Sequence, residues 1–314
     1  MSILITGSNG MAGRHAVDFF LKQTPHQIHC LDIVHRGEVK DERVHYYDVD
    51  MLSFEDLRSV VKKTRARKVL HLAGLTSVKD SLEEPLPALE INIMSCAYLL
   101  EALRLESPAS RVLAISSSEV YGPPSGGDVR RSEESPVRPQ TPYAASKAAL
   151  EHIVLQYFRA FGLKALVARP FNHTGPGQSE NFVLPGFAKR LMEIKLFRRE
   201  PVIFMGNIEV ERDFLDVRDV VRAYHLLLEK GKPGEIYNIC SGVAQPLRWV
   251  LEEMMRLSGV EADIRSDARM ERRVDIPILA GNNGKILREI GWQPAYRLED
   301  TLKSLLDEWK EKLS

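Results

Sequence analysis

The sequence contains little cysteine: Cys30, Cys96 and Cys240 are the only ones among 314 residues, and no two of them form a CxxC pair. This spacing argues against a disulfide framework and against a zinc site, because both need clustered or paired sulfur ligands. We therefore expect no bound metal. Thiols that are so few and so widely separated are typical of a protein from a reducing compartment.

An excess of charge is also missing, since 43 Lys and Arg residues balance 43 Asp and Glu residues. A nucleic-acid-binding protein usually carries a basic surplus, so no nucleic acid is expected as a partner. No apolar run reaches the roughly 18 residues of a membrane span. The chain also enters its first apolar segment, Ile3–Ile5, without a basic leader. We expect a cytoplasmic protein with no membrane partner.

Short apolar runs alternate with segments of helical period through the first half of the chain. The expected strands and helices are Ile3–Thr6, Gly13–Lys22, Gln27–Asp32, Phe54–Lys62, Lys68–Ala73, Ala88–Leu105 and Arg111–Ser116. This rhythm predicts the α/β class, with a doubly wound parallel sheet of the Rossmann type. After Val167 the alternation is less regular and prolines and glycines are frequent, which indicates a smaller C-terminal lobe.

The residues from Pro142 to Phe161 are predicted to form one helix. Thr141 can cap the free amides at its start, and Pro142 suits the first helical position. Gly162 suits the left-handed residue that commonly ends a helix.

A glycine-rich segment, Gly7-Ser-Asn-Gly10-Met-Ala-Gly13, follows the first expected strand and opens the first expected helix. Such a segment lets the backbone approach a pyrophosphate that faces the helix amides, although a tight turn is the structural alternative. Asp32 ends the next strand, where a carboxylate can accept hydrogen bonds from an adenosine ribose. It favours NAD(H), because it would repel the 2′-phosphate of NADP(H). The neighbouring His35 and Arg36 leave NADP(H) possible.

The sharpest polar cluster combines a strand end with the helix that follows it. The strand ends in Ser116-Ser117-Ser118-Glu119, and a separation of four places Tyr143 and Lys147 on one helical face. A nearby ammonium group, together with the positive nicotinamide ring of an oxidised cofactor, stabilises phenolate and so lowers the tyrosine pKa, which gives a usable acid–base group. Ser117 can hydrogen-bond the same substrate oxygen. Glu119 is either a further carboxylate base or a solvated loop residue.

Polar residues of the second half can serve an anionic substrate. Asn172 and His173 follow another expected strand and can reach a cleft between the lobes, although His173 can equally be a packed core residue. The three cations Lys189, Arg212 and Arg272 can meet a diphosphate, the arginines through bidentate pairs. Each of these cations can equally be a solvated surface residue.

With these motifs placed, the sequence resembles the extended short-chain dehydrogenase/reductases, in the group of nucleotide-sugar epimerases, dehydratases and reductases. The similarity runs from Gly7 to Gly291-Trp-Gln-Pro294. Within the group the chain is most similar to the GDP-4-keto-6-deoxy-D-mannose reductases, which form GDP-D-rhamnose, through residues 171–178 and 210–224. The GDP-mannose 4,6-dehydratases share the Ser-Ser-Glu cluster, but their Arg-Arg/Ser-rich insertion after the second strand is not found here.

The resemblance implies a homodimeric enzyme that uses NAD(H) or NADP(H) to reduce the C4 keto group of a GDP-linked 4-keto-6-deoxy sugar. A GDP-mannose 4,6-dehydratase and a nucleotide-sugar 4-epimerase remain open. A catalytically silent NAD-binding protein is a further alternative, but the presence of the whole catalytic triad, Ser117, Tyr143 and Lys147, argues against it. Residues 1–172 would form the dinucleotide-binding domain, to which the chain returns around 214–239. Residues 173–213 and 240–314 would form the substrate-binding lobe.

The residues that the patterns and the resemblance assign to the site fall into three sets. The catalytic set is Ser117, Tyr143, Lys147 and Glu119. The cofactor set is Gly7, Asn9, Gly10, Met11, Gly13, Asp32, Asp48, Val49, Leu72, Ala73, Gly74, Tyr143 and Lys147. The substrate set is Thr76, Ser118, Asn172, Lys189, Arg212, Arg272 and Asp275, with Asp275 on the substrate ribose.

Tyr143→Phe is expected to abolish turnover and to leave cofactor binding nearly intact, because it removes one ionisable hydroxyl and keeps the aromatic ring. Acid–base assistance of this kind contributes about 10²–10⁴-fold to a rate. Steady-state turnover and a cofactor titration of both proteins test this expectation. A variant that keeps most of the wild-type rate would contradict the catalytic assignment.

Overall fold

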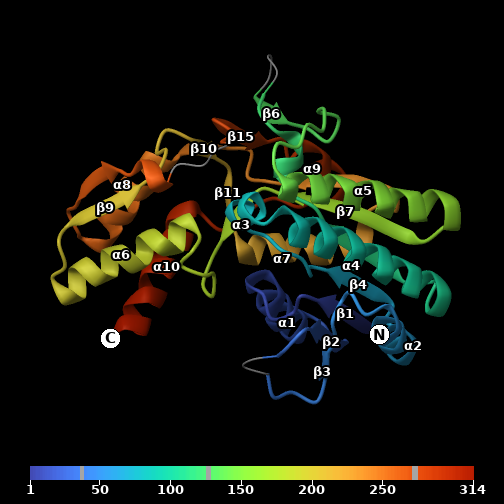
Figure 1. Ribbon diagram of the computed structural model, residues 1–314. Helices are drawn as coiled ribbons and strands as arrows, with labels where there is room; N and C mark the ends of the chain where they lie inside the picture. Colours follow the sequence, from blue (N-terminus) through green and yellow to red (C-terminus); the bar gives the residue numbers. More distant parts are fainter. Residues whose placement is uncertain (36–38, 125–128, 271–274) are drawn as a thin grey trace.

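A seven-stranded sheet in which every neighbouring pair is parallel dominates the computed structural model, which describes residues 1–35, 39–124, 129–270 and 275–314 (Figure 1). From edge to edge the strands are β12 (Ile236–Ile239), β7 (Lys164–Pro170), β5 (Arg111–Ile115), β4 (Lys68–His71), β1 (Ser2–Thr6), β2 (Gln27–Asp32) and β3 (Val44–Asp48). The predicted doubly wound parallel sheet is confirmed.

The strand order reverses between β1 and β4, because the chain goes from β1 to β2 and β3 on one side and resumes with β4 and β5 on the other. Such a reversal leaves a crevice at the carboxyl ends of the central strands, where ligands of this fold bind. The glycine-rich turn follows β1, Leu72–Gly74 follows β4 and Ser116–Glu119 follows β5. Three of the expected site segments therefore meet at this crevice.

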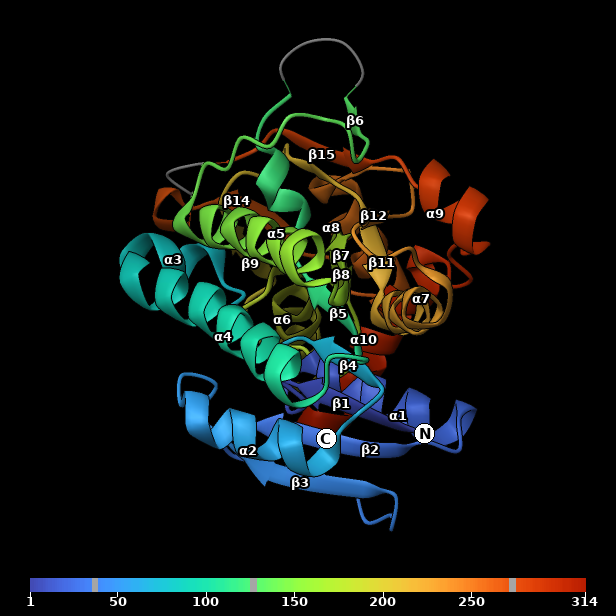
Figure 2. The same cartoon turned by 90° about the vertical axis from the view of Figure 1, so that its right-hand side faces the viewer.

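Helices cover both faces of the sheet (Figure 2). The helices α1 (Met11–Gln23), α7 (Val217–Lys230) and α9 (Gly284–Ile290) pack on one face, whereas α2 (Phe54–Thr64), α4 (Pro85–Glu106) and α5 (Pro142–Phe161) pack on the other. The short α3 (Val78–Glu83) packs against α4 and α5. Strand side chains alternate between the two cores: Ile3 and Ile5 face α1 and α7, and Leu4 faces α2 and α4.

The helix α5 has the boundaries and caps that the sequence predicts. Thr141 accepts a hydrogen bond from the Ala144 amide through its hydroxyl, Pro142 opens the helix, and Gly162 ends it with a φ of 69°. Because these caps act locally, they hold Tyr143 in the first helical turn.

The helix α4 is long and apolar enough to cross a membrane by composition alone. In the structure it packs along α5 and α2, and eight of its residues are buried. Its apolar character therefore supplies part of the core beneath the sheet.

The second lobe has its own core, formed by α6 (Val183–Phe197), α8 (Leu247–Ser258) and α10 (Leu298–Leu313), at the left of Figure 1. There β9 (Val202–Met205) pairs in parallel with β14 (Asp263–Ser266). Between the lobes β8 (Asn172–Thr174) pairs with β11 (Phe214–Asp216), and a four-stranded sheet orders β13 (Gln245–Pro246), β10 (Glu211–Arg212), β15 (Ile278–Gly281) and β6 (Arg130–Arg131). The 3-10 helices are η1 (Ser118–Tyr121) and η2 (Ala268–Met270).

The division between the lobes differs from the expected one in two places. The helix α9 and Trp292, expected in the second lobe, pack on the large sheet with α7, where the Trp292 indole donates to the Asp219 carbonyl at 3.1 Å. Conversely, β6 leaves the expected N-terminal domain and pairs with β15. Both corrections involve pairings between segments far apart in the sequence, which local patterns do not reveal.

Candidate active site

The glycine-rich turn brings the start of α1 against the ends of β1 and β4. A Cβ atom on Gly7, whose φ is 68°, would lie 2.7 Å from the Ala73 amide nitrogen. A Cβ atom on Gly13 would lie 2.3 Å from the Gly7 carbonyl oxygen, so only glycine permits this packing. The first turn of α1, from Met11, has no acidic residue. Helix amides without a competing carboxylate suit an anion such as a pyrophosphate.

Asp32 ends β2 beside this turn, and two backbone amides hold its carboxylate. Its Oδ2 accepts from the Asn9 amide at 2.8 Å, and its Oδ1 accepts from the Ile33 amide at 2.9 Å. A carboxylate oxygen has a second lone pair, so Asp32 can still accept a hydrogen bond from a ribose hydroxyl.

His35 joins the same region, although it is not among the expected site residues. Its Nε2 lies 3.2 Å from Ser8 Oγ, and its Nδ1 lies 2.7 Å from Asp48 Oδ1. The expected cofactor residue Asp48 is therefore exposed to solvent, and one of its carboxylate oxygens contacts the His35 imidazole. The next expected residue, Val49, is buried. Arg36, which left NADP(H) open, lies outside the described residues.

The segment Leu72–Gly74 lies next to Lys147. Its first two amides donate to the carbonyl and the hydroxyl of Thr6 at 3.1 and 3.2 Å. A Cβ atom on Gly74 would lie 2.5 Å from Asn92 Oδ1 and 3.6 Å from Lys147 Nζ. The absence of a side chain at Gly74 leaves the ammonium group of Lys147 close to the crevice.

Ser117, Tyr143 and Lys147 lie together at the end of β5, as the sequence predicts, and all three are buried. The side chain of Ser117 hydrogen-bonds the Tyr143 phenol. Lys147 Nζ donates to the Ile115 carbonyl at 2.9 Å and lies 6.0 Å from the centre of the Tyr143 ring. The charge of Glu119 acts on the same phenol, so Glu119 is also near the triad.

Burial governs the protonation of this triad. It raises the pKa of Tyr143 to about 12, against a smaller lowering by the Ser117 hydrogen bond. It lowers the pKa of Lys147 to about 8, although Cys96 and Glu151 act in the opposite direction. In the protein without cofactor, desolvation of the phenolate dominates the pKa of Tyr143. The expected lowering by Lys147 together with the positive nicotinamide ring stays a prediction for the complex with the oxidised cofactor. A phenol that stays protonated at neutral pH is suited to donate a proton.

A buried ion pair, which sequence reasoning missed, supports the strand end before Ser117. Arg169 donates to Glu151 through Nε at 2.8 Å and through Nη2 at 2.6 Å, and both side chains are at most 5% exposed. Ser116 donates to the same carboxylate at 2.5 Å. Arg169 also donates to the Tyr121 hydroxyl at 2.8 Å. The backbone on both sides of Ser117 is thus held by buried polar contacts.

The expected substrate residues near the triad differ in exposure. Asn172 lies on β8, and its buried Oδ1 has no hydrogen-bond partner among the described residues. His173 Nδ1 lies 3.0 Å from the Phe171 carbonyl, and burial lowers the pKa of His173. Ser118 is buried in η1, and Thr76 is exposed after β4.

The two expected cations that the structure describes, Arg212 and Lys189, pair with different carboxylates. Arg212 Nη2 donates to Asp275 Oδ1 at 2.7 Å, so the residues expected at the diphosphate and at the ribose are paired. Lys189 instead donates to Glu180 at 3.1 Å and lies 5.6 Å from the Trp309 ring centre. Arg272 lies outside the described residues.

Asp275 also lines a cavity of about 450 Å³ in the second lobe. Glu209 and Arg248 line the same cavity and pair with each other at 2.7 Å. Sequence reasoning missed both, because they come from segments that meet only in the tertiary fold. Among the described residues no group of three or more His, Cys, Asp or Glu side chains could hold a metal ion.

Known proteins resemble this chain over nearly its whole length. A family model described as GDP-mannose 4,6 dehydratase matches residues 4–305. The GDP-6-deoxy-D-mannose reductase of Pseudomonas aeruginosa is 33% identical over 312 residues, which cover 99% of this chain and 98% of that relative.

Two solved structures share the fold. RMD from Pseudomonas aeruginosa complexed with NADPH has a TM-score of 0.88 and 32% identity, covering 99% of this chain and 100% of the other. The UDP-glucose 4-epimerase of Thermotoga maritima with UDP-glucose has a TM-score of 0.90 and 26% identity, and both chains are covered completely.

The low pKa of Lys147 predicts an alkaline limit to nicotinamide-dependent turnover. The pKa of Lys147 is about 8, so its ammonium group is present below that pH and is lost above it. On the alkaline side kcat/KM should therefore fall about tenfold per pH unit. Lys147→Arg keeps its positive charge at alkaline pH, so in this variant the fall of kcat/KM should begin at a higher pH, even if the rate itself is lower. A wild-type profile that stays flat well above the pKa of Lys147 would contradict the role of its charge.

Proposed function

The chain belongs to the GDP-mannose 4,6-dehydratase family of the extended short-chain dehydrogenase/reductases, and from this membership we propose that it reduces GDP-4-keto-6-deoxy-D-mannose at C4 to GDP-D-rhamnose. One observation carries the proposal. Ser117, Tyr143 and Lys147 meet at the crevice of the sheet in a chain that is similar over its whole length to a GDP-6-deoxy-D-mannose reductase.

Some residues of the crevice would bind the cofactor, and others would transfer the proton or orient the substrate oxygen. The turn from Gly7 to Gly13 and Asp32 would hold a nicotinamide dinucleotide, which in its reduced form supplies a hydride to C4. Tyr143 donates its phenolic proton to the C4 oxygen, which becomes the product hydroxyl. Ser117 donates a hydrogen bond to that oxygen and orients it. The ammonium group of Lys147 stabilises the phenolate until a proton returns from water.

We propose that the substrate nucleotide extends from Asn172 toward the cavity lined by Asp275. Glu209 can accept from both N1–H and the 2-amino group of guanine, and Arg248 can donate to O6 and N7. Uracil and thymine present a single N–H between two carbonyl oxygens, which a carboxylate would repel. The pair Glu209–Arg248 therefore supports a GDP-linked substrate. Lys189 could reach the diphosphate only by leaving Glu180, which a half-exposed ion pair permits at little cost.

We infer that Asp32 favours NAD(H) over NADP(H). Its two carboxylate oxygens lie beside the turn, held by the amides of Asn9 and Ile33, where a 2′-phosphate would approach a negative charge. RMD from Pseudomonas aeruginosa was solved with NADPH, so this fold can accommodate a 2′-phosphate. The preference in this chain would come from Asp32 itself.

A homodimer with α4 and α5 at the interface also belongs to the proposal. The two helices pack side by side, and they leave Leu105 and Phe161 42% and 51% exposed. Apolar side chains exposed on adjacent helices suit a self-complementary contact between two copies.

The second candidate is a GDP-mannose 4,6-dehydratase, which the matching family model and the position of Glu119 favour. In that reaction a carboxylate removes the C5 proton, and the hydride taken from C4 is later returned. The dinucleotide is therefore not consumed, whereas a reductase consumes one per product molecule.

The reductase is expected to oxidise one NADH or NADPH for each molecule of GDP-4-keto-6-deoxy-D-mannose. Loss of nicotinamide absorbance and NMR identification of the product measure this ratio, and UDP- and dTDP-linked 4-keto sugars should react more slowly. Conversion of GDP-mannose by the protein alone, without net consumption of cofactor, would establish the dehydratase instead. In the same assay Glu119→Gln should cost less than about tenfold if Glu119 only positions hydroxyls, whereas loss of an essential base costs about 10²–10⁴-fold.

Wild-type protein is expected to bind NADH more tightly than NADPH, and Asp32→Asn should reduce this difference by about tenfold or more. Asparagine keeps an acceptor for the Asn9 amide, so the substitution isolates the effect of the charge. Titration of both cofactors into both proteins gives the four dissociation constants. A wild-type preference for NADPH would rule out control by Asp32.

A further inference from the structure

A tight turn, Gly175–Gln178, lies between the two lobes. The Gln178 amide donates to the Gly175 carbonyl at 3.3 Å, Pro176 occupies the second position, and Gly177 has a φ of 87°. These features define a type II turn, in which the third residue needs a positive φ. The central carbonyl and amide groups of the turn are not used within it, so they can bind other elements.

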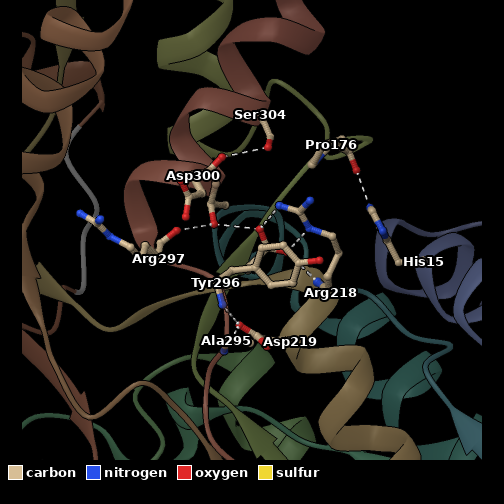
Figure 3. A network of polar contacts seen from close by, with 11 residues as sticks. His15, Pro176, Arg218, Asp219, Ala295, Tyr296, Arg297, Asp300 and Ser304 are labelled. Atoms are coloured by element: carbon tan, nitrogen blue, oxygen red, sulfur yellow. Dashed lines mark hydrogen bonds and ion pairs between the residues drawn. The ribbon is translucent and has the colours of Figure 1, made fainter.

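Two consecutive residues of α1 bind the turn from the side of the large sheet. Arg14 Nη2 donates to the Gly177 carbonyl at 2.8 Å. His15 Nε2 lies 2.8 Å from the Pro176 carbonyl, as Figure 3 shows. Both follow Gly13 directly, so they stand at the end of α1 that would face the dinucleotide. The contacts link residues 161 to 163 positions apart in the sequence.

The second lobe binds the opposite side of the turn. The Gly177 amide donates to Glu308 Oε1 of α10 at 2.8 Å, and Lys312 pairs with the same oxygen at 2.8 Å. A Cβ atom on Gly175 would lie 2.6 Å from a methyl group of Val217, at the start of α7. The turn is therefore enclosed by α1, α7 and α10.

The helix α10 is itself anchored beside the turn. Asp216 accepts from the Thr301 hydroxyl at 2.8 Å and from Arg218 at 2.6 Å. The Arg218 guanidinium lies 3.9 Å from the centre of the Tyr296 ring (Figure 3). Displacement of the turn would have to break its contact with Glu308 on a helix that Asp216 also holds through Thr301.

The turn continues directly from β8, which carries Asn172. Gln178 accepts from the Thr174 hydroxyl at 2.6 Å and donates to the His173 carbonyl at 3.3 Å. β8 also pairs with β11 through residues 172–174. The position of Asn172, whose amide oxygen has no hydrogen-bond partner in the part of the chain that the structure describes, is thus linked through the turn to the start of α1.

We propose that Arg14 and His15 are positioning residues that couple the cofactor and substrate sites by fixing this turn. The proposal rests on the proposed function, in which the dinucleotide lies at the start of α1 and the nucleotide sugar contacts Asn172. A dinucleotide that orders the start of α1 then also orders the turn and β8. GDP therefore binds more tightly when the cofactor is present, and by reciprocity the cofactor binds more tightly when GDP is present.

The experiment measures the affinity for GDP by calorimetry with and without saturating NAD⁺ or NADP⁺, whichever binds wild type more tightly. In wild type the cofactor should tighten GDP binding by about 5- to 150-fold, the usual range of such coupling. In Arg14→Ala/His15→Ala this factor should fall close to one, while the affinity for the cofactor alone stays the same. Turnover should show a lower kcat and a higher KM for the sugar nucleotide, because misplacement by about 1 Å can cost 10²-fold.

Matched variants separate positioning from a general effect on folding. Lys22→Ala removes a basic side chain of α1 whose ion pair among the described residues is with Asp18, and it should keep the full coupling. Arg14→Lys/His15→Gln keeps a donor at both positions and should restore most of the coupling if the alanine variant is too unstable to measure.

The possible outcomes test the positioning role of Arg14 and His15 separately from the proposed function. Coupling that is equal in wild type and in Arg14→Ala/His15→Ala, or absent from wild type although both ligands bind, would overturn the positioning role alone. A cofactor affinity that falls in the alanine variant without GDP present would show that Arg14 or His15 binds the dinucleotide directly and would also overturn it. A wild-type protein that binds neither dinucleotide would overturn the proposed function as well.

Discussion

The close contact between the start of α1 and the ends of β1 and β4 is the constraint on which the site depends. A Cβ atom on Gly13 would lie 2.3 Å from the Gly7 carbonyl, and one on Gly7 would meet the backbone of Ala73. Because no side chain separates these elements, the free amides of α1 face the point where the strand order reverses. The same contact sets Asp32, through the Asn9 amide, at the edge of the crevice.

Burial determines what the polar groups at this crevice can do. Desolvation keeps the Tyr143 phenol protonated and weakens the hold of Lys147 on its proton. The Arg169–Glu151 pair is buried with almost all of its donors and acceptors used, and it binds Ser116 next to the triad. A buried ion pair contributes little net stability, but its geometry is strict. We interpret it as a support that fixes the end of β5 on which Ser117 lies.

The two lobes are joined by polar contacts to backbone groups and by a small buried apolar cluster. Gly177 uses its carbonyl toward Arg14 and its amide toward Glu308, so one short turn binds elements of both lobes. The three large apolar clusters each belong mainly to the large sheet or to the second lobe, whereas a small cluster packs Val120, Tyr121 and Phe171 against Ile276 and Leu279. Hydrogen bonds have narrower preferred geometry than apolar contacts, which makes them suited to set the distance between two binding sites.

The sequence by itself determined the features that depend on local spacing. The alternating strands and helices, the caps of α5, the glycine pattern of the first turn and the shared helical face of Tyr143 and Lys147 follow from periodicity and from the φ angles that particular residues allow. Tertiary structure alone decided the direction of the Tyr143 pKa, the pairing of Arg212 with Asp275, the Glu209–Arg248 cavity and the place of α9. These features depend on burial and on contacts between distant segments, and no local pattern encodes how far a side chain is from water or which distant residue it meets.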